Sequence, residues 1–135
     1  MDVNGADVLE INQACARLVA LYCRYVDDGD HAALIDLWTE DAVWTSIAGP
    51  MTGHGEIARY LASKPATVSR HLCGNLLLDV IDSDNAVGSC DFIALIGTGD
   101  PDRPVIQKAG RYEDRYRRTA NGWKFAARVM RLAEL

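Results

Sequence analysis

The apolar pattern of the chain changes at Pro65, and this change constrains the fold more than any other feature of the sequence. Before Pro65, apolar residues recur every three or four positions, as they do on helices with one buried face. After it, turn signals separate a series of apolar stretches, as they do in strands joined by hairpins. Helices followed by hairpin-linked strands predict an α+β fold in which the helices pack on one face of an antiparallel sheet.

Three helices are expected in the N-terminal part. The first should span residues 7–26 and carry its apolar positions on one face. These positions are Val8, Ile11, Cys15, Leu18, Tyr22 and Tyr25. Gly29 favours the end of that helix, and Asp30 is a favourable N-cap for a second, shorter helix that continues to Trp38. A third helix fits residues 55–63.

The remaining apolar stretches are expected to be strands. One strand should span residues 42–47 and end in a turn at Gly49 and Pro50. The stretches after Pro65 span residues 67–72, 76–81, 86–96, 105–118 and 123–132. A strongly twisted sheet wrapped over helices leaves a concave interior, where ligand sites are often found. We therefore expect one cone-shaped domain over residues 1–135, with one small-molecule pocket.

The charge balance argues against nucleic acid and membrane partners. The 135 residues include 19 acidic and 14 basic side chains, and the net charge of −5 offers no basic surplus for phosphate backbones or anionic membranes. Arg111, Arg115, Arg117 and Arg118 are interleaved with acids, which favours a solvated or self-paired strand face. No apolar run approaches the roughly 18 residues of a membrane span and no signal peptide is predicted, so we expect a cytoplasmic protein.

Neither a metal nor a cofactor is expected. Cys15, Cys23, Cys73 and Cys90 lie far apart, without the short paired spacing of zinc or redox sites, so each is expected to be a buried, reduced thiol. The three histidines lack the spacing of metal ligands. No serine elbow, phosphate loop or dinucleotide fingerprint accompanies them.

Asp27 and His71 are the strongest candidates for chemistry. Asp27 and Asp28 lie at the end of the first helix, where a carboxylate faces the negative end of the helix dipole; such an acid is either simply solvated or held for function. His71 shares its strand face with Ser69 and Cys73, and a lone strand histidine is either structural or a base. If the pair meets in a pocket, the carboxylate would fix the imidazole tautomer and stabilise its protonated form.

Two aromatic residues and the other histidines are weaker candidates. Tyr22 lies five residues before the acid on the first helix, and Trp44 lies in the first strand. Both are more often core aromatics than ligand contacts. His31 opens a surface helix, and His54 lies between glycines in an expected turn.

Five segments, in their order along the chain, point to a known family. They are LYCRYVDDGD (21–30), LWTEDAVW (37–44), GHGEI (53–57), RHLCGN (70–75) and GRYEDRYRRTANGWKF (110–125). Over nearly its whole length the chain resembles the SnoaL-like branch of the NTF2-like superfamily. Within it, the chain is similar to the scytalone dehydratases, hexachlorocyclohexane dehydrochlorinases and bile-acid 7α-dehydratases, which are eliminating enzymes without a cofactor.

The resemblance implies a cone-shaped NTF2-like fold and specific roles for several residues. Asp27 and His71 match the Asp–His pair of those enzymes. Tyr22 matches a tyrosine that the bile-acid enzymes carry at the same spacing, and Trp44 matches a pocket aromatic of the dehydrochlorinases. Copies of the chain are expected to form a dimer or a trimer through the sheet, as relatives do.

At one position the chain departs from the family pattern, and at another the matching residue is not decided by the sequence. The scytalone dehydratases have a second pocket histidine on the strand that matches residues 86–96, where Asp91 is the only ionisable residue. An arginine on the last strand of some relatives matches either Arg128 or Arg131, and we expect Arg128 to contact the substrate.

The expected activity is therefore a cofactor-independent, dehydratase-like elimination on a small apolar or aromatic molecule. His71 would take a proton from carbon, Asp27 would orient it, and Tyr22 would assist the leaving oxygen or halide. An isomerase of the ketosteroid type is the nearest alternative, because it uses the same base without a leaving group. A small-molecule-binding protein without chemistry is the other, because fold does not dictate function.

Overall fold

The computed structural model describes residues 3–135. The helices in this part of the chain are α1 (Gly5–Asp28), α2 (His31–Asp36) and α3 (Gly53–Ser63). The strands are β1 (Trp38–Ser46), β2 (Gly49–Thr52), β3 (Ser69–Val80), β4 (Asn85–Ile96), β5 (Val105–Thr119) and β6 (Gly122–Leu132). The predicted α+β fold, with helices packed on a curved sheet, is confirmed.

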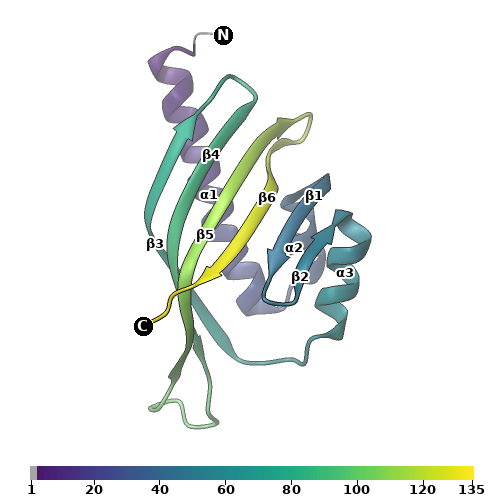
Figure 1. The fold of residues 1–135 in the computed structure, drawn as a ribbon, viewed down its shortest axis with the longest axis vertical. Helices are drawn as coiled ribbons and strands as arrows, with labels where there is room; N and C mark the ends of the chain where they lie inside the picture. Colours follow the sequence, from purple (N-terminus) through teal and green to yellow (C-terminus); the bar gives the residue numbers. More distant parts are fainter. Residues whose placement is uncertain (1–2) are drawn as a thin grey trace.

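The strands form one six-stranded sheet in the order β2-β1-β6-β5-β4-β3. In Figure 1, α1 runs behind the long strands β3 to β6, and α3 lies beside β2 at the other edge of the sheet. The sheet is antiparallel except at one place, because β1 pairs with β6 in parallel. The expectation of a wholly antiparallel sheet is corrected at this pair.

Helix α1 has a cap at each end. The side chain of Asn4 accepts a hydrogen bond from the backbone of Asp7, and Gly29 adopts a left-handed conformation with a φ of 67°. Such a conformation is easy only for glycine, so the chain leaves the helix there and Asp27 stays in its last turn. The helix extends beyond the predicted 7–26 at both ends. No helix within residues 3–135 is long and apolar enough to cross a membrane.

Two short elements differ from their predictions. Helix α2 ends at Asp36, and Trp38 opens β1 instead of closing the helix. The predicted turn at Gly49 and Pro50 belongs to the short edge strand β2, where proline is tolerated because its missing N–H faces no partner strand.

The core lies between α1 and the concave face of the sheet. The helix contributes Cys15, Leu18 and Tyr22, and the strands contribute residues such as Phe92 and Tyr112, all of which are buried. Because α1 packs along β3, the last turn of the helix lies against the first residues of that strand. This contact brings together the two residues singled out in the sequence.

Candidate active site

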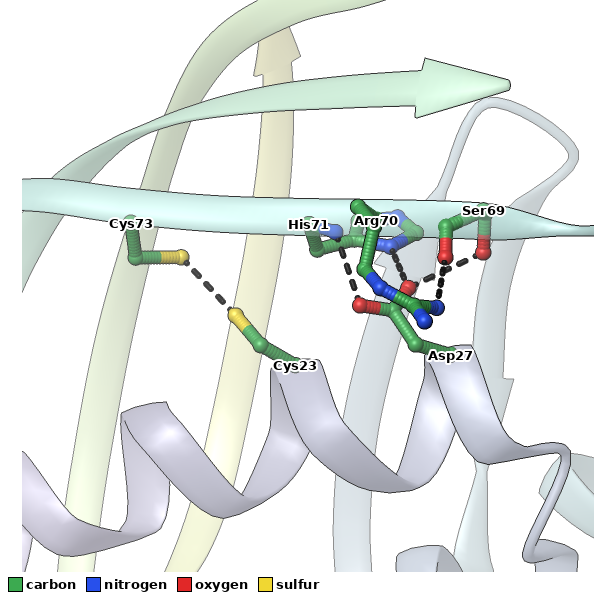
Figure 2. Close-up of polar contacts among 6 residues, drawn as sticks. All are labelled: Cys23, Asp27, Ser69, Arg70, His71 and Cys73. Carbon is green, nitrogen blue, oxygen red and sulfur yellow. Dashed lines mark hydrogen bonds and ion pairs between the residues drawn. The ribbon is translucent and has the colours of Figure 1, made fainter. Parts of the chain in front are cut away.

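Asp27 and His71 are joined by hydrogen bonds across the α1–β3 contact. The Asp27 Oδ1 atom lies 2.7 Å from His71 Nδ1, and Oδ2 accepts the backbone N–H of His71 at 2.9 Å. Ser69 donates its hydroxyl to Oδ1 at 2.9 Å. Figure 2 shows the carboxylate between the helix and the strand, facing Ser69 and His71. The side chains of His71 and Asp27 are only 11% and 7% exposed.

The carboxylate fixes the state of the imidazole ring. An ionised carboxylate can only accept hydrogen bonds, so Nδ1 carries the proton and Nε2 carries the free lone pair. Nε2 makes no hydrogen bond to any other group among residues 3–135. His71 therefore has its basic nitrogen free, while Asp27 can stabilise the imidazolium that would form after proton transfer.

A cavity of about 600 Å³ lies beside this pair, and both residues line it. About half of its lining residues are apolar or aromatic, with Tyr22, Trp44, Tyr60 and Tyr112 among them, and the rest are polar or charged. Such a volume is typical of sites for small organic ligands. A base at the wall of a cavity of this size can abstract a proton from a molecule bound there.

Tyr22 and Trp44 both line the cavity, as expected. The rings of Tyr22 and Trp44 pack edge to face at 5.8 Å, and Trp44 packs in the same way on Tyr60 at 5.4 Å. Burial raises the pKa of Tyr22 well above its ordinary value, although Arg128 and a hydrogen bond with Tyr112 oppose this shift. The hydroxyl of Tyr22 therefore stays protonated and can donate a hydrogen bond.

Arg128 does not contact the cavity, and its expected role in substrate binding is corrected. Its side chain is 0% exposed and forms a two-point ion pair with Asp114, at 2.7 Å from Nε and 2.9 Å from Nη2. The guanidinium lies 3.9 Å from the ring centroid of Tyr112 and 4.3 Å from that of Tyr22. Because these two rings line the cavity, the arginine lies behind its wall.

The other open positions also lie away from the cavity. Arg131 is exposed and pairs with Glu113 at 3.0 Å. Asp91 is bound by Arg111 and Asn75, each at 2.9 Å, on the outer part of the sheet. Asp91 therefore does not replace the second pocket histidine of the scytalone dehydratases.

The four cysteines lie on α1, on β3 and on the neighbouring strand β4. Cys23 and Cys73 approach to 3.3 Å between their sulfur atoms, as Figure 2 shows. Cys73 is half-buried instead of buried because β3 is an edge strand, whereas Cys15, Cys23 and Cys90 are buried as predicted. The hydrogen bond that the Cys73 thiol donates to Cys23 and the burial of the thiol help to raise the pKa of Cys73 to about 12, so this thiol stays protonated.

Within residues 3–135, no candidate metal site lies beside the pair. No group of three or more histidine, cysteine or acidic side chains in the described part of the chain could hold a metal ion. A second hollow, of about 510 Å³, is lined by His54, Asp41 and Arg117. The Nε2 atom of His54 is bound to the carbonyl of Trp38 at 2.8 Å, so this imidazole supports the backbone.

Sequence reasoning did not foresee several features of the site. Alternation places Ser69 on the strand face of His71, but its hydrogen bond to Asp27 was not predicted. Lys64 and Lys108 also line the cavity, but a single lysine after a helix or within a strand gives no signal in the sequence.

Comparisons with known proteins agree with this fold. Residues 7–129 match the model of the SnoaL-like domain. A Mycobacterium tuberculosis protein of unknown function is 26% identical, with a TM-score of 0.83 over 94% of this chain and 78% of that chain. A scytalone dehydratase-like protein from Novosphingobium aromaticivorans is 20% identical, with a TM-score of 0.85 over 96% of this chain and 89% of that chain.

A type 2 hexachlorocyclohexane dehydrochlorinase (LinA) shares the fold as well. It is 22% identical, with a TM-score of 0.83 over 96% of this chain and 89% of that chain. No curated protein matches the sequence. Since the family model matches most of the chain and the fold agrees with it, the chain belongs to the SnoaL-like domain family.

Proposed function

We propose that this protein is a cofactor-independent lyase that eliminates water or hydrogen halide from a small, largely apolar or aromatic molecule. The observation that carries the proposal is the 2.7 Å contact between Asp27 and His71 at the wall of the cavity. This contact leaves the basic nitrogen of the imidazole free for a proton on carbon.

In the proposed reaction, each residue has one role. His71 Nε2 takes the proton, and the electron pair of the broken C–H bond forms the new double bond. The leaving group departs with the electrons of its own bond to carbon, and Tyr22 donates a hydrogen bond to it. Asp27 stabilises the imidazolium, which then gives its proton to the leaving group or to water.

The names of two neighbours favour elimination over other chemistry. One is scytalone dehydratase-like and the other is a dehydrochlorinase, and both names describe eliminations. At 20% and 22% identity they support this chain's activity only by analogy of fold.

A direct test compares two histidine variants on a panel of cyclic β-hydroxy ketones and chlorinated rings. Turnover to the unsaturated product should fall by about 10²–10⁴-fold in His71→Gln, because the base is lost. His54→Gln, which removes an imidazole from the second hollow, should retain turnover. Unchanged turnover in His71→Gln would disprove the role of His71 as the base. Activity that is lost on chelation and restored by zinc would show that the reaction depends on a metal instead.

An isomerase of the ketosteroid type is the second candidate. The protonated Tyr22 favours it, because a buried hydroxyl can stabilise an enolate oxygen as well as a leaving group. Mass spectrometry of the product separates the two reactions. Elimination loses water or hydrogen halide, whereas isomerisation leaves the mass unchanged.

A further inference from the structure

Lys108 stands apart from the other basic residues that are shielded from solvent. Among residues 3–135, the buried or half-buried basic side chains are Lys108, Arg117, Lys124 and Arg128. Arg117 pairs with Asp41, Lys124 with Asp36 and Arg128 with Asp114. Lys108 alone in this set has no carboxylate partner. A half-buried ammonium group without a counterion is an unfavourable arrangement unless a ligand supplies one.

The strand register points Lys108 to the same cavity as the base. His71 on β3 lies opposite Ala94 on β4, and Ala94 lies opposite Lys108 on β5. Directly opposite residues share one face of a sheet, and two strand spacings separate their backbones by about 10 Å. Only the methyl group of Ala94 lies between them in this row. Lys108 and His71 both line the cavity.

Lys64 is a second cation at the same cavity. It follows the end of α3, and its Nζ atom lies 4.7 Å from the ring centroid of Tyr60, another lining residue. Burial lowers the pKa of Lys108, and the charge of Lys64 lowers it further. Asp28 also borders the cavity, but no ion pair joins it to either lysine.

We propose that the cavity binds an apolar or aromatic carboxylic acid whose carboxylate is held by Lys108 and Lys64. Two ammonium groups match the two oxygens of one carboxylate, and the aromatic wall around Tyr22 and Trp44 matches an apolar body. The idea that His71 then removes a proton from this bound acid rests on the proposed function. Recognition of the carboxylate depends on the lysines alone.

Binding of matched acids and amides tests the proposal. The probes are benzoate, naphthoate and anthracene carboxylate, each compared with its neutral carboxamide by calorimetry at low salt. At least one acid should bind about tenfold or more tightly than its amide. This preference should disappear in Lys108→Met and weaken in Lys64→Met. Arg59→Gln removes an exposed charge from α3 outside the cavity and should keep the preference.

Each contrary result has a definite meaning. Equal affinity for acids and amides, absence of binding of every acid, or a preference that survives in Lys108→Met would overturn the carboxylate site. Catalysis that fails while the acid preference behaves as expected would overturn only the lyase proposal. Catalysis that depends on His71 without any acid preference would overturn only the carboxylate site.

Discussion

Asp27 illustrates how a local conflict in a sequence can mark a site. A carboxylate in the last turn of a helix faces the negative end of the dipole, at a typical cost of about 0.3–1 kcal/mol. In this protein three donors converge on it: the hydroxyl of Ser69 and the ring and backbone nitrogens of His71. Asp28, one position later, is exposed and makes no comparable contact. Asp28 is therefore a suitable control position for substitutions of Asp27.

Asp27→Asn should lower turnover by orders of magnitude, and Asp28→Asn should not. The amide keeps the shape of the carboxylate but can neither hold the Nδ1 proton nor stabilise the imidazolium equally well. Turnover and thermal melts of both variants check this prediction. Equal retention of activity would disprove the role of Asp27, and a loss confined to Asp28→Asn would assign that role to the other carboxylate.

Tyr22→Phe should lower turnover by about 10²-fold, because it removes a hydrogen-bond donor while the ring keeps its packing. Burial raises the pKa of Tyr22, so the native protein should show no loss of the proposed activity from tyrosine ionisation up to pH of about 10. Tyr25→Phe, on the same helix but outside the cavity, is the control. A rate profile that falls near pH 9 in the native protein and not in Tyr22→Phe would contradict the assignment.

At the scale of the elements, periodicity predicted the long helices and strands well but not their pairing. The stretches 67–72 and 76–81 were predicted as two strands but belong to one, β3 (Ser69–Val80). They look separate in the sequence because an irregularity between Gly74 and Leu77 interrupts the alternation. The short β2 looks like a turn in the sequence, since its first residues are Gly49 and Pro50. The parallel pairing of β1 with β6 is a long-range contact that no local pattern encodes.

The site was also predictable only in part, because it too depends on long-range contacts. The Asp27–His71 contact could be expected from the family resemblance, but the burial of Arg128 could not. Its alternation on β6 places it on the concave face, and only the packed structure shows that it pairs with Asp114 behind two tyrosine rings that line the cavity. Lys108 was missed because the sequence does not show that this side chain is half-buried without a carboxylate partner.

Arg128 should matter for stability, because it links β5, β6 and α1. Arg128→Met leaves the buried Asp114 without its counterion, and we expect a loss of about 3–5 kcal/mol in the free energy of unfolding. Arg131→Met breaks an exposed pair between the same two strands and should change it by less than about 1 kcal/mol. Urea denaturation measures both. Similar losses in the two variants would show that the buried pair has no special role.

At the scale of the whole molecule, no helix covers the outer face of the sheet (Figure 1). Exposed apolar side chains lie on this face. Leu72 on β3 and Ile93 on β4 are directly opposite each other, and they are 61% and 41% exposed. They lie on the face opposite His71, because successive strand residues alternate. Contiguous exposed apolar residues of this kind typically mark protein–protein contacts.

We therefore expect the outer face to pair copies of this chain into a dimer or trimer, as the family resemblance implies. Leu72→Glu places a charge at the centre of the expected contact and should shift the protein toward monomer in sedimentation experiments. Leu9→Glu changes an equally apolar residue, 70% exposed on α1 and away from the sheet, and should leave the oligomer intact. Because His71 points to the opposite face, the monomeric variant should still bind ligands in the cavity. A native protein that sediments as a monomer at all concentrations, or an oligomer that survives Leu72→Glu, would show that this face is not the interface.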